Sequence, residues 1–387
     1  MKVIVINQYC ENRGDEAAGT ALVRNLLGKP KIDQIDIIYN SANKLDIDHP
    51  KILHRNEELR LKKIGKLGIL RYLLLRKTVL RRLSFANETM REMARTISEA
   101  DVIYVTPCGA SLGIYKDWAF LLRLLFVISE NKTPVFCLNT INASGNILFD
   151  FLAKLVLRKS KVYVREQRSV DYLKSIQVKS ELGVDTAFSE QPIIMERDPK
   201  RIGLVVTLLE WHPEFTGRNM SQEVIENIVP GIAQYCIENE YEIELIPHTG
   251  QQDETEYIQE VIRALEDNGM LKESLIFRKD VNTSDEYDLA LASKRFVVGM
   301  RYHSIVLAAK NAVPFVALAY ENKMKEVCKY TNSMESYLNL QEVLTSEDVY
   351  KKMKLVDDKL DIIKENLISI NQEKLQILSR LPLKEIQ

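Results

Sequence analysis

Short apolar runs alternate with helical stretches along most of the chain, and this alternation restricts the possible folds more than any other feature. One series of expected strands comprises 3–6, 34–39, 102–105, 135–138 and 162–164. A second series, after Asp198-Pro199, comprises 202–207, 242–247, 274–277, 296–298 and 315–318. Such alternation is typical of parallel sheets covered by helices on both faces. The sequence therefore predicts an α/β fold with two doubly wound, Rossmann-like domains facing a cleft.

The length of 387 residues also favours two domains, because it exceeds what one hydrophobic core usually serves. We expect an N-terminal domain over 1–195 and a C-terminal domain over 196–345. Residues 346–387 have a helical, charged pattern, and we expect them to pack back across the domains. Ligands of such folds bind beyond the carboxyl ends of the strands, so side chains that follow the expected strands are the candidates for function.

Composition excludes several classes of function. A net charge of −1 argues against nucleic acid as a partner, since binding it usually requires a basic excess. The five cysteines are scattered and form no C-x-x-C pair, which predicts neither a zinc site nor a disulfide framework. No P-loop, G-x-S-x-G or H-E-x-x-H motif is present. We expect a cytoplasmic protein without a metal.

The segment 59–83 is strongly basic and contains no acidic residue. Its nine cationic residues are Arg60, Lys62, Lys63, Lys66, Arg71, Arg76, Lys77, Arg81 and Arg82. Leucines are interleaved among them, and a basic amphipathic stretch of this kind can lie at the surface of an anionic membrane. A solvated helix that packs its apolar side on its own domain is the alternative, and Gly65 and Gly68 interrupt the helical pattern. Both interpretations stay open at this point.

The segment Gly299-Met300-Arg301-Tyr302-His303-Ser304 follows an expected buried strand and starts an apolar helix. The first-turn N–H groups and the positive end of the helix dipole lie at the same place as Arg301 and His303. Arg301 and His303 are therefore candidates for binding a phosphate or carboxylate and for donating a proton.

The first expected strand ends in a polar segment that opens a helix. Gly14 permits a tight turn, and Asp15 can cap the helix that follows. A helix cap is the simpler interpretation. Asn12 and Glu16 nevertheless lie where they could bind sugar hydroxyls.

Two more strand ends carry candidate residues. Gly109 and Ser111 follow the strand at 102–105, where glycine lets backbone approach a ligand, although a plain turn would look the same. Cys108 reads as a small core residue. His248 follows the strand at 242–247 and is a candidate ligand contact.

Arg165 follows the strand at 162–164 in the same way that Arg301 follows its own strand. A single arginine at a strand end is usually a surface charge or an ion-pair partner. Two of them, one from each domain, could fork onto one small dianion if the domains close.

Together these segments resemble the polysaccharide pyruvyl transferase family. The matching segments are Asn12–Ala17, Gly109–Gly113, Val164–Ser169, Gly183–Phe188 and Gly299–Ser304, with Pro314 and Tyr320–Lys323. One departure is Pro107-Cys108-Gly109-Ala110, where the family often has consecutive glycines.

The resemblance implies transfer of a pyruvyl group from phosphoenolpyruvate to two hydroxyls of one sugar, giving a cyclic ketal and phosphate. It also implies the GT-B-like architecture of many glycosyltransferases, with an acceptor side in the N-terminal domain and a donor side in the C-terminal domain. The acceptor would be a sugar or lipid-linked oligosaccharide, which would give the basic segment 59–83 a purpose at the inner face of the cell membrane. No cofactor is expected.

The resemblance assigns provisional roles. Arg165 and Arg301 would clamp the donor's carboxylate and phosphate, and His303 would protonate its carbon 3, since a nearby dianion favours the charged form of a histidine. Asp15, Glu16 and His248 are the candidates for the general base. Further substrate contacts are expected from Asn12, Gly14, Gly109, Ser111, Tyr302, Tyr320 and Lys323.

Two alternatives remain. A nucleotide-sugar glycosyltransferase of the same architecture would also use a histidine and an arginine of the second domain, on a diphosphate. A non-catalytic member that binds polymer or acts as a scaffold belongs to another class, and the joint presence of Arg165, Arg301 and His303 argues against it.

Overall fold

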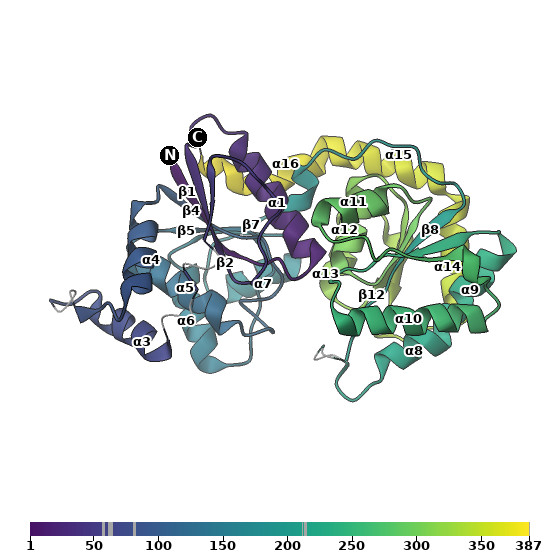
Figure 1. Cartoon of the computed structure of the whole chain (residues 1–387), viewed down its shortest axis with the longest axis horizontal. Coiled ribbons are helices and arrows are strands. Elements are labelled where there is room, and N and C mark those ends of the chain that lie inside the picture. Colours follow the sequence, from purple (N-terminus) through teal and green to yellow (C-terminus); the bar gives the residue numbers. More distant parts are fainter. Residues whose placement is uncertain (56–58, 61–64, 80–82, 211, 213–214, 387) are drawn as a thin grey trace. The chain divides into compact units, whose positions relative to one another are not determined.

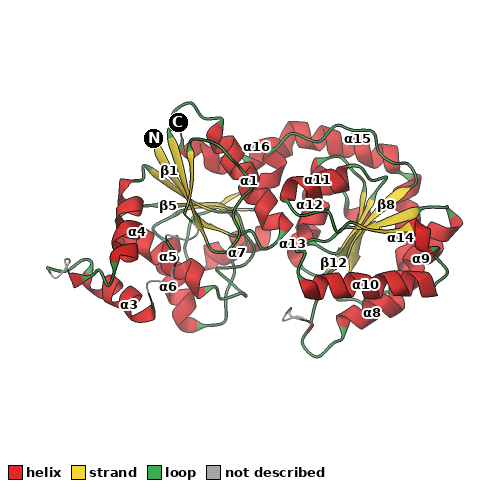
Figure 2. Ribbon diagram, in the orientation of Figure 1, coloured by secondary structure: helices red, strands yellow, loops and turns green. Residues whose placement is uncertain are grey.

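The computed structural model describes residues 1–55, 59–60, 65–79, 83–210, 212 and 215–386 (Figures 1 and 2). Its contacts divide the chain into two compact units. The first unit comprises 1–11, 15–190 and 375–387, and the second comprises 12–14 and 191–374. The expected C-terminal helical segment 346–387 is thus divided between the units after Lys374.

The first unit is built on a parallel sheet in the order β3-β2-β1-β4-β5-β6-β7. Its strands are β1 (Lys2–Gln8), β2 (Gln34–Tyr39), β3 (Ile52–His54), β4 (Val102–Val105), β5 (Pro134–Asn139), β6 (Lys161–Val164) and β7 (Glu181–Leu182). The central strand β1 pairs with β2 through Val3 and Ile35 and with β4 through Val3 and Val102.

Helices cover both faces of this sheet. They are α1 (Arg13–Leu27), α3 (Lys66–Leu75), α4 (Glu88–Glu99), α5 (Trp118–Ser129), α6 (Ile147–Leu157), α7 (Gln167–Ser175) and α16 (Gln376–Ser379). Polar side chains cap the N-termini of three of them. Asn87 of α4, Asp117 of α5 and Asn146 of α6 each accept a hydrogen bond from a first-turn N–H of that helix.

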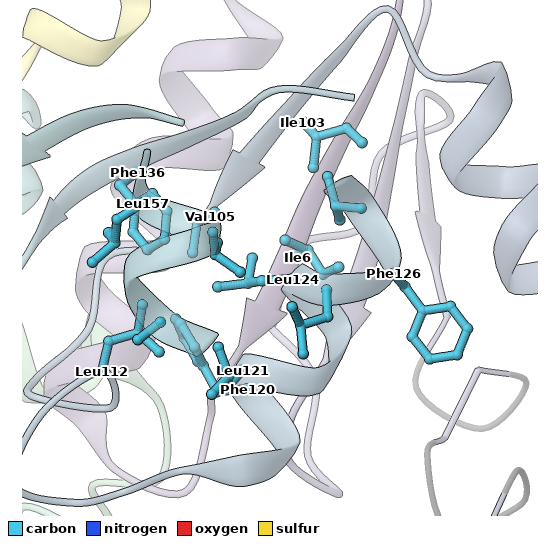
Figure 3. Packing of buried hydrophobic residues seen from close by; sticks show 14 of the residues in the cluster. Ile6, Ile103, Val105, Leu112, Phe120, Leu121, Leu124, Phe126, Phe136 and Leu157 are labelled. Atoms are coloured by element: carbon cyan, nitrogen blue, oxygen red, sulfur yellow. The ribbon is translucent and has the colours of Figure 1, made fainter. Parts of the chain in front are cut away.

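Alternation along β1 gives the first unit two apolar clusters. Ile4 and Ile6 point into one cluster with residues of α3 to α7, part of which Figure 3 shows around Leu124 and Phe136. Val3 points to the opposite face, where residues of α1 and the C-terminal segment pack. Burial of both faces explains why β1 is a nearly continuous apolar run.

The second unit repeats this plan with a parallel sheet in the order β10-β9-β8-β11-β12-β13. Its strands are β8 (Arg201–Val205), β9 (Glu242–Leu245), β10 (Leu275–Phe277), β11 (Val297–Gly299), β12 (Phe315–Ala319) and β13 (Tyr337–Asn339). Its helices are α8 (Met220–Asn227), α9 (Val229–Glu238), α10 (Gln252–Asp267), α11 (Ser284–Ala292), α12 (Tyr302–Lys310), α13 (Asn322–Tyr330), α14 (Ser346–Asp358) and α15 (Leu360–Ile370).

The predicted fold of two parallel, doubly wound α/β sheets is confirmed. In each sheet the strand order reverses at one point, between β1 and β4 in the first and between β8 and β11 in the second. Ligands of such sheets bind beyond the carboxyl ends of the strands near that point. The edge strands β3, β7 and β13 were not predicted from the sequence, because each has only two or three residues and no apolar run of its own. Among the described helices, none combines the length and apolar character needed to cross a bilayer.

Candidate functional site

Candidate side chains of the second unit gather where β9, β11 and β12 end. His248 follows β9, Arg301 follows β11 as the residue before α12, and Tyr320 and Glu321 follow β12 directly. Because all three strands are parallel members of one sheet, their carboxyl ends share one edge. The structure therefore brings several of the predicted residues to the expected edge of this sheet.

The turn from β11 into α12 depends on Gly299. A Cβ atom there would lie 2.3 Å from Ser304 Oγ, and this hydroxyl donates a 2.5 Å hydrogen bond to the carbonyl of Arg301. The N-cap residues, Arg301 of α12 and Glu321 of α13, do not cap their helices with their side chains. Both helix ends thus keep first-turn N–H groups and a positive dipole end for an anion.

Aromatic and imidazole rings pack tightly behind this turn. The rings of His248 and His303 are stacked with centroids 6.5 Å apart, and the Tyr302 ring meets His303 edge-on at 4.9 Å. His303 is only 5% exposed, and His248 and Tyr302 are equally buried. The two imidazoles are therefore held in fixed positions at the start of α12.

The surroundings of His248 favour its neutral imidazole form. Burial lowers its pKa well below the ordinary value, and the nearby Arg301, His303, Arg13 and Lys323 lower the pKa further. Within the described part of the chain, His248 Nδ1 and Arg301 Nε are buried and lack a hydrogen-bond partner. Buried polar atoms without partners are rare and costly, so this pair marks a place where a polar ligand would be favoured.

Lys323 adds a second cation to this edge. Its Nζ lies 3.0 Å from Glu321 Oε1 and 5.5 Å from the centre of the Tyr302 ring. Burial would raise the pKa of Glu321, but Lys323 and the neighbouring His212 and Tyr320 hold it below its ordinary value. Glu321 is thus a partly buried carboxylate that orients Lys323.

Sequence reasoning did not single out His212 or Glu321. The Nε2 atom of His212 lies 3.8 Å from Glu321 Oε1, and its ring meets Tyr320 edge-on at 5.5 Å. Glu321 could have been recognised, because it directly follows an expected strand. His212 lies in a loop after β8, and no pattern in the sequence connects it to β12.

Residues 12–14 group with the second unit by their contacts. The amide of Arg13 donates a 2.9 Å hydrogen bond to the carbonyl of His248. A Cβ atom at Gly14 would lie 2.0 Å from His303 Nδ1, so only glycine fits beside this ring. The predicted substrate contacts of Asn12 and Gly14 remain predictions, and steric fit already accounts for Gly14.

Arg165, in the first unit, is buried in an ion pair. Its side chain is 1% exposed, one terminal nitrogen lies 2.5 Å from Asp185 Oδ2, and Nε donates to Thr140 Oγ1 at 3.3 Å. Asp185 also accepts a hydrogen bond from the amide of Ala187. A carboxylate already balances this guanidinium, and the motif around Asp185 supplies it. The structure thus gives Arg165 an ion pair within the first unit, and its role as a donor clamp remains a prediction.

Carboxylates surround Tyr9 at the end of β1. Burial raises the pKa of Tyr9 to about 12, with further contributions from Asp15, Glu11 and Asp117. Asp15 is half-buried and Glu16 is buried in the first turns of α1. An aromatic ring among acceptor groups is suited to sugar hydroxyls, and the candidate base Asp15 belongs to this group.

The loop after β4 closes on itself. The amide of Ser111 donates to the carbonyl of Gly109 at 2.8 Å, and the carbonyl of Ser111 accepts from the amide of Asp117 at 3.1 Å. A Cβ atom at Gly109 would lie 3.1 Å from the Tyr115 ring. The tight turn accounts for the glycine, and substrate contacts of Gly109 and Ser111 remain predictions.

Among the described residues, no group of three or more His, Cys, Asp or Glu side chains is placed to hold a metal ion. All five cysteines are buried, and none forms a disulfide.

Comparison with known families gives one match over most of the chain. The model of the polysaccharide pyruvyl transferase family matches residues 12–322. A comparison with curated protein sequences finds no match.

Solved structures with a similar fold include enzymes that act on nucleotide sugars. The glycosyltransferase from Rickettsia africae has a TM-score of 0.62 at 11% identity, with coverage of 99% of this chain and 97% of that one. Alr3699/HepE from Anabaena, solved with UDP and glucose, has a TM-score of 0.60 at 13% identity, covering 100% and 98%. The UDP-GlcNAc 2-epimerase from Methanocaldococcus jannaschii has a TM-score of 0.57 at 13% identity, covering 93% of each chain. At these identities the likeness concerns the fold alone, and it confirms the GT-B-like class.

Removing either member of the Arg165–Asp185 pair should destabilise the protein. Asp185→Asn or Arg165→Met leaves a buried charge without its partner, and we expect the free energy of unfolding to fall by roughly 3–5 kcal/mol. Urea denaturation measures this loss. Lys384→Met, which breaks the exposed ion pair with Glu181, is the matched control and should cost less than about 1 kcal/mol. If both buried variants kept the wild-type free energy of unfolding, the ion pair would not be structural, and a donor-binding role of Arg165 would again be favoured.

Stability should depend on pH through His248. Its pKa is lowered on folding, so below about 6.5 the unfolded chain binds a proton that the folded protein does not. The free energy of unfolding should therefore fall as the pH drops below about 6.5, and His248 should cause no such fall above that pH. His248→Gln should remove this part of the slope, whereas His49→Gln should retain the wild-type slope. If the curves of unfolding free energy against pH were parallel for wild type and His248→Gln, the lowered pKa of His248 would be refuted.

Proposed function

Because the chain belongs to the polysaccharide pyruvyl transferase family, we propose that it moves the pyruvyl group of phosphoenolpyruvate onto two hydroxyls of one sugar. The product is a cyclic ketal, and phosphate is released. The acceptor is a sugar of a polysaccharide or of its lipid-linked precursor. The proposed location is the cytoplasm, with which five buried thiols outside any disulfide agree.

The observation that carries this proposal is the gathering of Arg301, Arg13 and Lys323 near His248 at the edge of the second sheet, where Glu321 pairs with Lys323. Arg301 has a buried Nε without a hydrogen-bond partner in the described part of the chain, and Lys323 lies on the Tyr302 ring. Phosphoenolpyruvate carries a phosphate and a carboxylate, so it requires at least two cationic contacts. Arg301 and Lys323 provide them in this proposal, together with the uncapped N-termini of α12 and α13. Arg165 is no longer needed as a clamp.

His303 is the proposed acid. It donates a proton to carbon 3 of the donor, which makes carbon 2 electrophilic, and one sugar hydroxyl forms a C–O bond to carbon 2. The bond between carbon 2 and the phosphate oxygen breaks, and the second hydroxyl closes the ring. Two hydroxyl protons are lost in total: one balances the proton gained by carbon 3, and the other leaves with phosphate.

His248 is a poor candidate for the acid, because its pKa lies well below the ordinary value, which favours the neutral imidazole. As a neutral imidazole stacked on His303, it is able to accept a hydrogen bond, and the lowered pKa makes it a weak base. On the acceptor side, Asp15 and Glu16 remain the proposed candidates for the base, and the carboxylates around Tyr9 support binding of sugar hydroxyls there. Tyr302 and Tyr320 form walls at the donor edge in this proposal.

The direct test is to incubate the protein with phosphoenolpyruvate and a panel of free and lipid-linked sugars. We expect release of phosphate and, by mass spectrometry, a product that has gained one pyruvate less one water. Incubation with nucleotide sugars in parallel tests the alternative. Transfer of a glycosyl group without any ketal product would identify a glycosyltransferase and overturn the proposal.

Replacing the proposed acid should slow turnover without abolishing donor binding. We expect His303→Asn to reduce kcat by ~10²–10⁴-fold, the usual contribution of a general acid. Continuous phosphate release measures the rate. His49→Asn, a histidine in a loop of the first unit, is the matched control and should retain wild-type turnover. A kcat within twofold of wild type for His303→Asn would exclude it as the acid.

Arg301→Lys should weaken the donor site although the charge is retained. An ammonium cannot form two parallel hydrogen bonds to a carboxylate or phosphate, so we expect KM for phosphoenolpyruvate to rise by about tenfold or more. Initial rates at varied donor concentration measure this change. Arg263→Lys, an exposed position on α10, serves as the control and should leave KM unchanged. An unaltered KM in Arg301→Lys would remove Arg301 from the donor contacts.

A further inference from the structure

The helix α3 of the first unit has one buried and one exposed apolar side. Ile69 and Tyr72 face the core, and Arg76 is buried in an ion pair with Glu130, which also accepts a hydrogen bond from Tyr72. This anchoring fixes the rotation of the helix about its axis. On the opposite side Leu67, 83% exposed, starts a stripe that continues through Leu70 and Leu74 at helical spacing. Val79 and Leu83 beyond the helix are exposed as well.

The helix α6 repeats this arrangement on the same face of the sheet. Its Phe149, Ala153 and Val156 belong to the same buried cluster as Ile69 and Tyr72 of α3, and α5 contacts both helices (Figure 1). The outer side of α6 exposes four large apolar side chains, Ile147, Leu148, Phe151 and Leu155. Ile147 is 90% exposed.

We define the apolar face as the exposed side chains of these two segments. They are Leu67, Leu70, Leu74, Val79, Leu83, Ile147, Leu148, Phe151 and Leu155. Large exposed apolar sets of this kind mark sites of contact with a partner or a membrane.

The charged residues beside the apolar face indicate whether it contacts a membrane or another protein. Arg71 and Lys77 are exposed next to the stripe of α3, and Arg158 and Lys159 are exposed at the end of the stripe of α6. Leucine-rich stripes bordered by lysine and arginine fit the headgroup region of an anionic bilayer. The buried core of a contact between two copies of a chain would instead be depleted of such charges.

We propose that the apolar face docks on the surface of an anionic membrane, with the leucines and Phe151 entering the headgroup boundary and the cations meeting lipid phosphates. The attachment is peripheral, since no described helix can cross a bilayer. This inference is independent of the proposed reaction, because it rests only on side chains far in sequence from the donor edge. It resolves the two interpretations of the basic segment together: one side of α3 packs on its own unit, and the other faces lipid.

Co-sedimentation of the full-length protein with vesicles tests the proposal. We expect binding to vesicles of equal parts phosphatidylcholine and phosphatidylglycerol, and much weaker binding to phosphatidylcholine alone. Leu70→Gln with Leu74→Gln should weaken binding by about tenfold, and Ile147→Gln with Phe151→Gln should do the same. Arg71→Glu with Lys77→Glu should weaken vesicle binding at low salt, and this loss of binding should be smaller at high salt.

A matched control pair removes exposed apolar side chains of the second unit. Val343→Gln with Ile362→Gln changes two residues that are 89% and 66% exposed and should bind vesicles as wild type does. Thermal unfolding of each variant verifies that the fold is retained. Absence of binding to anionic vesicles, or equal losses in the control pair, would overturn the proposal. A wild-type dimer that becomes monomeric in Leu70→Gln with Leu74→Gln would also overturn it, because a second copy would then occupy the face.

Discussion

The turn between β11 and α12 is the constraint on which the proposed chemistry depends. Gly299 leaves room for the hydroxyl of Ser304, which donates a hydrogen bond to the carbonyl of Arg301. This hydrogen bond closes the turn, so the helix begins directly after the strand. As a result Arg301, His303 and the positive end of α12 occupy one place. A residue with a Cβ at 299 would push that helix away and separate the guanidinium from the imidazole.

The two units share a topology but differ in the charge at the carboxyl edges of their sheets. In the first unit the arginine after β6 is neutralised by Asp185, and carboxylates surround Tyr9. In the second unit burial lowers the pKa of His248, and the nearby Arg301, His303, Arg13 and Lys323 lower it further. One edge is therefore suited to hydroxyl groups and the other to an anion, and the assignment of an acceptor side and a donor side remains a prediction.

Periodicity predicted most of the fold, because buried parallel strands are apolar runs and the helices between them are long. It missed β3, β7 and β13, whose short edge positions depend on pairing with a neighbouring strand and not on their own composition. At the site, strand-end position correctly led to Arg301, His303 and His248 as neighbours. The same rule gave no sign that Arg165 is paired, because its partner Asp185 lies twenty positions further along the chain and only the folded sheet brings the two together. His212 was missed for the same reason, since its contact with Glu321 joins two distant loops.

The central claim is that the positive edge of the second unit binds phosphoenolpyruvate. Isothermal titration calorimetry of the wild-type protein with phosphoenolpyruvate, and separately with UDP-glucose, tests it most directly. The account predicts saturable binding of phosphoenolpyruvate and none of UDP-glucose. Binding of UDP-glucose in the absence of any heat from phosphoenolpyruvate would contradict it.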